Sequence, residues 1–351
     1  MSEQPFGQAE FKSRVDGALD RFVRTETDAL LALDAGLAPL AHVLTTATSR
    51  GKRLRSAFCY WGWRAAGQPD SDALVRAAAS MELVHAAAVV HDDIIDDSRL
   101  RHGLPTAHVA LRAAFADGPR PKARARSTAM LAGDLLMAWA GQLFAGCGLP
   151  SAYLGRARDL WAVLARELIA GEALEILHTG AAPDVRRSLK VIRYKTAKYT
   201  VEHPLHIGAS LAGAGPPLRE VFTDYGLPLG EAFQLRDDLI GLFGDPATTG
   251  KSCTDDIATA RPTALVALAQ EAATAAERRE LSSLLGRRSL TAAQAGRVRE
   301  VVRRTGAHDR VESMITERVE VAVRALDGAG LPPLAHRALT RLATAATSRP
   351  D

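Results

Sequence analysis

The stretch 71–97 reads SDALVRAAASMELVHAAAVVHDDIIDD and joins an alanine-rich apolar segment to a run of aspartates. Ser71 followed by Asp72 is typical of a helix start. Apolar residues then recur at three- and four-residue steps as far as Val90. We therefore predict one long helix that begins near Ser71 and runs into the acidic residues.

The same helical periodicity continues through most of the 351 residues, and runs with the period of two typical of strands are absent. Further helices are predicted over 127–144, 156–178, 187–212 and 218–243, with three more in 263–346. No repeat or long linker divides the chain. We expect a single all-α domain over 1–351, with ten or more helices around a central active-site cavity and disordered ends at about 1–8 and 346–351.

Composition excludes several classes of protein. The chain has 44 basic and 40 acidic residues, a net charge of +4 that is too small and too scattered for nucleic-acid binding. Its three widely spaced cysteines fit a reduced cytoplasmic protein without a zinc site. The N-terminal residues lack the features of a signal peptide. The most apolar stretch, 131–150, is interrupted by Asp134 and Gln142, so no membrane span is expected.

The acidic run indicates a cation site. On a helix Asp92 lies one turn before Asp96, and Asp93 one turn before Asp97. Each like-charge pair at this spacing destabilises a helix by about 0.2–0.5 kcal/mol, so a positive partner is expected. Carboxylates on a rigid helix suit Mg²⁺, which usually also binds substrate phosphates. The alternative is a solvated acidic helix end.

A second acidic pair, Asp237 and Asp238, follows Phe233 and Gln234 in an apolar segment. Burying an unpaired carboxylate costs several kcal/mol, so either a cation or a shifted pKa is expected here as well.

Several basic groups could accompany these carboxylates. Lys52 and Arg55 are three residues apart and could share one helical face that clamps a diphosphate. His85 lies two turns before Asp92 on nearly the same face. A cation also stands beside a hydroxyl at 195–196. Taken singly, each feature has an ordinary structural explanation. The pair at 52 and 55 is typical of a solvated helix start, the histidine is typical of a core residue, and the pair at 195–196 carries no signal by itself.

Taken in order, the motifs resemble those of the trans-prenyl diphosphate synthases, or polyprenyl synthetases, over about 50–263. The matching segments are Gly51-Lys52 with Arg55, Glu82–His85, Asp92–Asp96, Leu100–Gly103, Gly133–Leu136, Lys195-Thr196, Phe233–Asp238 and Gly250-Lys251. The resemblance implies an all-α homodimer that uses Mg²⁺ to join isopentenyl diphosphate to an allylic diphosphate, head to tail.

The resemblance also implies a role for each matching residue. Asp92, Asp96 and Asp237 would hold three Mg²⁺ ions on the allylic diphosphate, supported by Asp93 and Asp238. The departing diphosphate would be neutralised and held by Arg101, Lys195, Lys251, Arg261, Thr196 and Gln234. Isopentenyl diphosphate would be bound by Lys52, Arg55 and His85. Asp92, Asp96, Lys195 and Asp237 would be the catalytic residues.

The chain departs from the family pattern at several positions. Arg50 replaces a glycine and Ser56 a proline, and the second of two arginines after the first aspartate motif is His102. Glu172 and Glu175 stand where glutamine and aspartate are usual. Gly241 replaces the last aspartate of the second motif, and Ser252-Cys253-Thr254 lacks the usual proline and glycine.

Small residues before Asp92 predict the product length. Ala88 and Ala87, four and five residues before it, would leave the product tunnel open, and Val84 lies one turn further. We expect the twenty-carbon geranylgeranyl diphosphate, with products of twenty-five to thirty carbons as the alternative. Two other functions remain open: a class I terpene cyclase, or a catalytically weak subunit that regulates another synthase.

Overall fold

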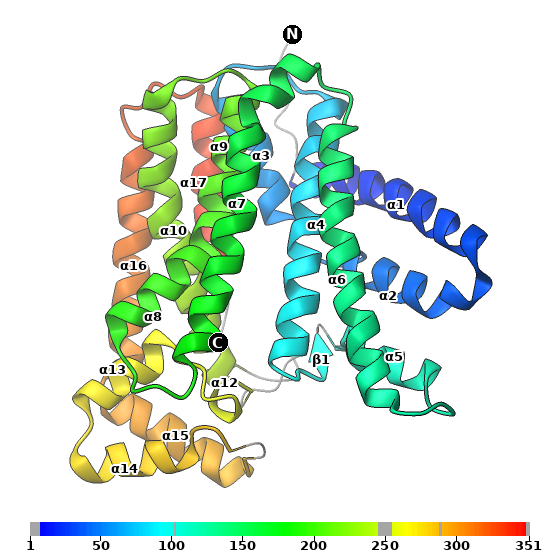
Figure 1. The fold of residues 1–351 in the computed structure, drawn as a ribbon. Helices are drawn as coiled ribbons and strands as arrows, with labels where there is room; N and C mark the ends of the chain where they lie inside the picture. Colours follow the sequence, from blue (N-terminus) through cyan, green and yellow to red (C-terminus); the bar gives the residue numbers. More distant parts are fainter. Residues whose placement is uncertain (1–7, 102, 245–254, 288–289, 349–351) are drawn as a thin grey trace.

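The computed structural model describes residues 8–101, 103–244, 255–287 and 290–348. Within these ranges the regular structure is helical apart from one hairpin of two-residue strands (Figure 1). The prediction of an all-α fold with at least ten helices is confirmed. In chain order the elements are α1 (Gln8–Leu33), η1 (Ala35–Leu37), α2 (Ala38–Thr48), α3 (Leu54–Ala65), α4 (Asp72–Ile95), β1 (Leu100–Arg101), β2 (Leu104–Pro105), α5 (Ala107–Ala114), α6 (Pro121–Ala145), α7 (Ser151–His178), α8 (Val185–Ile192), η2 (Arg193–Glu202), α9 (His203–Leu211), α10 (Pro216–Phe243), α12 (Asp255–Ala258), α13 (Ala264–Ala272), α14 (Ala275–Leu284), α15 (Ala292–Arg304), α16 (Ala307–Leu326) and α17 (Pro333–Thr347).

Helix α4 begins where the sequence predicts. Ser71 is its N-cap, and the Ser71 side chain accepts a hydrogen bond from the backbone N–H of Leu74. Most of α4 is buried, and it packs against α1, α3 and α6. It is also the one helix in the described residues that is long and apolar enough to cross a membrane, but 72% of its most apolar window is buried, as in a core helix.

The range 187–212, predicted as a single helix, consists of three successive helical segments in the structure. Between α8 and α9 lies η2, a ten-residue π-helix. It is packed between α7 and α10, and the close approach depends on two glycines. A Cβ at Gly171 of α7 would overlap the backbone of Lys195, and one at Gly230 of α10 would overlap Ala197. These contacts bring η2 within reach of charged side chains on both neighbours.

Two clusters of buried apolar side chains form the core. The larger joins α1–α7, η2, α9, α17, most of α10 and the C-terminal end of α16, and the smaller joins α8, α12–α15, the first half of α16 and the C-terminal half of α10. Phe233 of α10 belongs to the larger cluster and Leu235 to the smaller, so this helix connects the two. The prediction of three helices in 263–346 was wrong, because α13–α17 fill this range.

Candidate functional site

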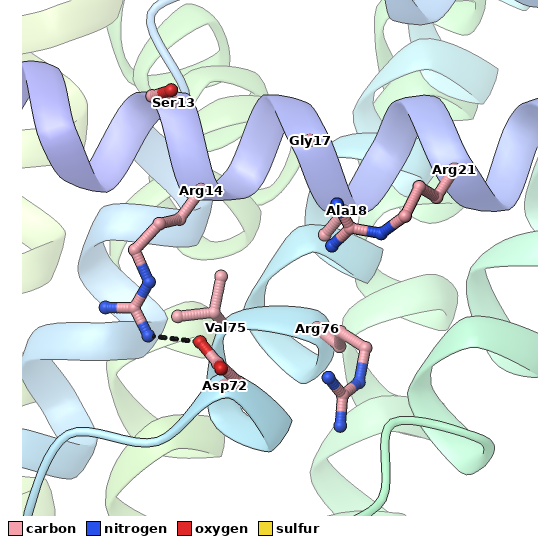
Figure 2. A pocket seen from close by; sticks show the side chains of 8 residues that line it. All are labelled: Ser13, Arg14, Gly17, Ala18, Arg21, Asp72, Val75 and Arg76. Atoms are coloured by element: carbon pink, nitrogen blue, oxygen red, sulfur yellow. Dashed lines mark hydrogen bonds and ion pairs between the residues drawn. The ribbon is translucent and has the colours of Figure 1, made fainter.

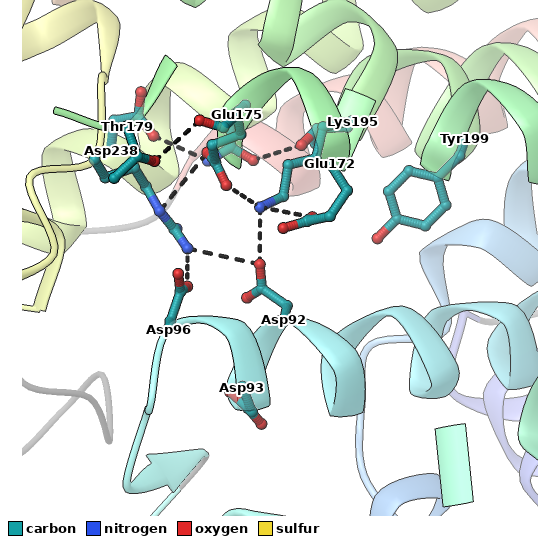
Figure 3. A network of polar contacts seen from close by, with 12 residues as sticks. Asp92, Asp93, Asp96, Glu172, Glu175, Thr179, Lys195, Tyr199 and Asp238 are labelled. Atoms are coloured by element: carbon teal, nitrogen blue, oxygen red, sulfur yellow. Dashed lines mark hydrogen bonds and ion pairs between the residues drawn. The ribbon is translucent and has the colours of Figure 1, made fainter. Parts of the chain in front are cut away.

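The C-terminal end of α4 carries two carboxylates that face cations from distant parts of the chain (Figure 3). Asp92 Oδ1 lies 2.8 Å from Lys195 Nζ, on η2. Arg261, which lies between α12 and α13, has its Nη2 3.6 Å from the same oxygen and also pairs with Asp96. The structure therefore brings together the predicted residues Asp92, Asp96, Lys195 and Arg261.

Two further carboxylates complete this cluster. Glu172 and Glu175 lie one turn apart on α7, and Lys195 Nζ is 2.9 Å from Glu172 Oε2 and also pairs with Glu175. One ligand atom from each of Asp92, Glu172 and Glu175 lies within 4.8 Å of the others, an arrangement that could hold a metal ion. The sequence interpretation noted both glutamates only as departures from a family pattern. Their i, i+3 spacing was the signal that they share a face.

The charges perturb one another strongly. Burial raises the pKa of a carboxyl group, but Arg261, Lys195 and Arg101 outweigh this effect and hold the pKa of Asp92 well below its usual range. Asp96 is different, because burial and the nearby Asp92 charge together raise its pKa to about 7 despite Arg261. Burial also raises the pKa of Glu172. Oε1 of Glu172 is buried and has no hydrogen-bond partner within the described residues. The cluster thus has room for additional positive charge.

The second acidic pair lies on α10, beside η2. Thr196 donates a hydrogen bond of 2.8 Å to Gln234 Oε1, and the Gln234 amide donates one of 2.9 Å to Asp238 Oδ1. Asp238 is buried and lies on the Glu175 side of the carboxylate cluster (Figure 3). Asp237 is partly buried on the same helix. Three predicted residues are therefore connected in one chain of hydrogen bonds.

Asp93 does not face the cluster. Its side chain is only 5% exposed and points away from Asp92 and Asp96 (Figure 3). Arg101 Nε donates to Asp93 Oδ1 at 3.1 Å, and Arg101 Nη2 lies 3.4 Å from Asp92 Oδ2. In this structure Arg101 links the two aspartates. The predicted stacking of Asp93 on Asp97 is wrong, because Asp97 lies beyond the helix end with a φ of +53°.

A second group of basic residues lies further along η2, around Tyr199 (Figure 3). Arg55 is buried and donates hydrogen bonds of 2.6 Å to Tyr199 Oη and 2.9 Å to Thr200 Oγ1. His85 Nδ1 lies 3.2 Å from the same Tyr199 hydroxyl. Lys52 is exposed and precedes α3, so the expectation that it shares a helical face with Arg55 was wrong. Sequence reasoning missed Tyr199 and Thr200, which are recognisable only once η2 is placed.

The residues predicted to set product length lie on α4. Ala87 is fully buried and Val84 is 2% exposed, whereas Ala88 is partly exposed. Ala88 and His85 lie one and two turns before Asp92, so the three share one side of the helix. The predicted diphosphate ligand Lys251, together with His102, lies outside the described residues.

A cavity of about 230 Å³ lies at the opposite end of α4, against α1 (Figure 2). It is lined by Arg14, Arg21, Asp72, Arg76 and smaller residues. Arg14 closes part of it through an ion pair of 2.6 Å with Asp72. Twenty helical residues, or about 30 Å, separate Asp72 from Asp92. The cavity is therefore separate from the carboxylate cluster.

Comparison with known proteins gives a consistent result. A family model described as Polyprenyl synthetase matches residues 38–303. A geranylfarnesyl diphosphate synthase from Aeropyrum pernix is 32% identical over 277 residues, which cover 78% of this chain and 81% of that protein. An all-trans-nonaprenyl-diphosphate synthase (geranyl-diphosphate specific) from Rhodobacter capsulatus is 31% identical over 336 residues, 93% of each chain.

The fold is also similar to solved structures. The crystal structure of a geranylgeranyl pyrophosphate synthase from Corynebacterium glutamicum, complexed with isoprenyl diphosphate and magnesium, superposes with a TM-score of 0.91. The two chains are 34% identical, and the match covers 97% of this chain and 99% of the other.

Proposed function

Because the chain belongs to the polyprenyl synthetase family and is a polyprenyl diphosphate synthase, we propose that it condenses isopentenyl diphosphate with an allylic diphosphate, head to tail, to give geranylgeranyl diphosphate. The observation that carries this proposal is the cluster in which Asp92 meets both Lys195 and Arg261. It combines ligands for a divalent cation with cations for a diphosphate in one place.

The residues of the cluster fit Mg²⁺. Oxygen ligands from several carboxylates suit this ion, and the buried Glu172 Oε1, which has no hydrogen-bond partner in the described residues, supports the binding of more positive charge here. A relative of the same fold was crystallised with magnesium. We assign three Mg²⁺ ions to Asp92, Asp96 and Asp237, with Asp238 in support. When bound, Mg²⁺ supplies positive charge that stabilises the departing diphosphate.

The protein's own cations act on the same leaving group. Lys195 and Arg261 lie at the cluster, and each would exchange a carboxylate partner for a phosphate oxygen when the allylic diphosphate binds. Thr196 and Gln234 fix the adjoining turn of η2 to α10. Concentrating positive charge where negative charge develops lowers the barrier to cleavage of the carbon–oxygen bond.

Arg55 and His85 are proposed to bind the diphosphate of isopentenyl diphosphate, together with the exposed Lys52. Tyr199 holds the first two, because its hydroxyl contacts both. The buried Nε of Arg55 has no hydrogen-bond partner in the described part of the chain, which leaves it able to donate to a phosphate. The apolar residues of α4 between the two diphosphate sites would exclude water from the allylic cation.

The twenty-carbon product is proposed from Ala87 and Ala88, whose small side chains leave the tunnel beside α4 open, and from the larger Val84 further along. Relatives make products of different lengths, as their names show. Membership of the family therefore leaves the length open, and products of twenty-five to thirty carbons are the alternative.

We also propose that the enzyme is a cytoplasmic homodimer. Large apolar side chains are exposed on α6 and α7, namely Met130, Leu131, Ile169, Ile176 and Leu177. A second copy of the chain would cover them. Light scattering coupled to size-exclusion chromatography tests this, and a monomer at micromolar concentration would contradict it.

One assay tests the proposed reaction. Purified protein is incubated with isopentenyl diphosphate, Mg²⁺ and each allylic primer in turn, and the products are dephosphorylated and sized. We expect elongated diphosphates, with activity lost on chelation of the metal. A cyclised hydrocarbon would identify a terpene cyclase instead, and no product would favour a regulatory subunit.

A further inference from the structure

The fourth carboxylate of the acidic run has no place in the proposed chemistry. Helix α4 ends at Ile95, Asp96 is its C-cap, and Asp97 turns away from the carboxylate cluster. Three basic side chains from α5 and α6 lie beside it instead. Asp97 Oδ1 lies 3.3 Å from Arg126 Nη1, 3.5 Å from His108 Nε2 and 3.8 Å from Arg112 Nη2.

The backbone at Asp97 completes a helix-ending motif. Asp97 N–H donates to Ile94 O at 3.4 Å, and Ser98 N–H donates to Asp93 O at 3.0 Å. This is the Schellman pattern, in which the residue after the C-cap takes a left-handed conformation and is usually glycine. Aspartate tolerates that conformation better than most residues, but still at a cost of about 1 kcal/mol or more. Surrounding contacts must therefore hold it there.

The three basic side chains supply those contacts. Arg126 binds the turn twice, because its Nη2 also donates to Ile94 O at 2.9 Å. His108 is fully buried, and its Nε2 has no hydrogen-bond partner in the described residues, so the nearby Asp97 carboxylate compensates a buried polar atom. Thr106, two residues before His108, donates from Oγ1 to Ser98 O at 2.7 Å. The carboxylate of Asp97 thus ties the end of α4 to α5 and α6.

This anchor fixes the geometry of two residues of the site. Asp96 immediately precedes the left-handed turn, so the direction of its side chain depends on where the turn is held. The chain then enters the β1–β2 hairpin, which returns Arg101 to Asp93 and Asp92. We propose that Asp97 is a positioning residue, whose anchoring by Arg126, His108 and Arg112 holds Asp96 and Arg101 in the geometry needed to bind the metal and diphosphate. The proposal rests on the proposed role of Asp92 and Asp96 as ligands of a divalent cation.

Two variants of Asp97 test the anchor. Asp97→Asn keeps the size of the side chain but removes its charge, and Asp97→Gly favours the left-handed turn while removing the anchor altogether. We expect both to raise the Mg²⁺ concentration for half-maximal activity by about tenfold. We expect kcat at saturating Mg²⁺ to stay within about twofold, since no group that contacts substrate is lost. Binding of Mn²⁺ in the presence of inorganic diphosphate, followed by electron paramagnetic resonance, should weaken in parallel.

Arg126→Met separates anchoring from simple electrostatics. Removing a positive charge near the site should by itself strengthen cation binding, whereas loss of the anchor should weaken it. We expect weaker Mn²⁺ binding. Asp117→Asn, an exposed carboxylate in the turn between α5 and α6, removes one negative charge as Asp97→Asn does and should leave Mn²⁺ affinity within about twofold of wild type.

The outcomes distinguish this proposal from the proposed function. Unchanged Mn²⁺ affinity in Asp97→Gly, or tighter binding in Arg126→Met, would overturn the positioning role even in a fully active synthase. A wild-type protein that binds Mn²⁺ and diphosphate but forms no elongated product would overturn the proposed reaction. It would leave the Asp97 measurement valid, because that readout needs no turnover.

Discussion

Lys195 Nζ lies 2.8 Å from Asp92 Oδ1, so an ion pair joins η2 to α4 across the candidate site. The same ammonium group contacts Glu172 and Glu175 on α7. One lysine therefore compensates three carboxylates, and it would compete with a metal ion for their oxygens.

Replacing this lysine should separate catalysis from metal binding. Lys195→Gln removes a cation that stabilises the leaving diphosphate, and we expect kcat to fall by about 100-fold to 1000-fold. It also leaves the three carboxylates without their shared cation, so the rise in melting temperature on adding Mg²⁺ should be larger than in wild type. Lys190→Gln, an exposed site on α8, is the matched control. A Mg²⁺-dependent rise in Lys195→Gln no larger than that of wild type would show that the lysine does not compete with the metal for these carboxylates.

Product length should respond to bulk beside Asp92. Ala88→Phe has space on the partly exposed side of α4 and should shorten the product without loss of stability. Ala87→Phe should also shorten it, but at a cost of about 1–3 kcal/mol, because Ala87 is fully buried. Chromatography of the dephosphorylated products and thermal melting give the two readouts, with Ala88→Ser as the control. An unchanged length profile in Ala87→Phe would contradict the tunnel assignment.

Ser56 should be required for stability. Its N–H and its hydroxyl both lie within hydrogen-bonding distance of Glu82 Oε1, at 3.0 and 3.1 Å, and Glu82 is buried. Ser56→Pro removes both donors from a buried carboxylate, so we expect it to lower the free energy of unfolding by about 2–3 kcal/mol. Ser56→Ala keeps the N–H and should cost less. Urea denaturation measures both, and equal stability of the proline variant and wild type would disprove this role.

His203 should make stability depend on pH. Burial lowers the pKa of His203, whose Nε2 lies 2.7 Å from Glu167 Oε2. The unfolded chain has a histidine pKa of about 6.5 and so takes up a proton more readily as the pH falls below that value. The stabilising contribution is therefore complete above about pH 6.5 and is lost as the pH falls towards 5.

The variant His203→Gln should reduce this loss. We expect its melting temperature to fall less than that of wild type between pH 7 and pH 5. His336→Gln, at a partly exposed histidine on α17, should leave the wild-type slope intact. Identical slopes in wild type and His203→Gln would show that another group is responsible.

The sequence predicted the parts of the fold that depend on local patterns. Ser71 caps α4, and apolar periodicity marks α6, α7 and α10. The breaks between the C-terminal helices were missed, although Thr274 with Glu277 and Thr291 with Gln294 form the capping boxes that mark two of them. The π-helix was not predictable in the same way. It depends on packing between Gly171 and Gly230, which are 59 positions apart in the chain.

The sequence predicted those residues of the candidate site that the family resemblance covers. Asp92, Asp96, Lys195 and Arg261 converge as expected. The reversal of Asp93 towards Arg101 depends on the hairpin β1–β2, which no pattern in the sequence indicated. The contribution of Glu172 and Glu175 appears only when α7 is placed beside η2, since charged residues at helical spacing are more often solvated.

The π-helix also constrains the number of residues that the chain can have in this segment. The hydrogen bonds of a π-helix run to a carbonyl five residues back, one more than in an α-helix, as from His203 N–H to Lys198 O at the end of η2. A one-residue deletion within 193–202 would allow an α-helix to form, but would change the angles at which the following side chains leave the axis. If the deletion follows Lys195, this lysine would still face Asp92, but Tyr199 and Thr200 would no longer reach Arg55. Insertions and deletions, which surface loops tolerate, would therefore not be tolerated within 193–202.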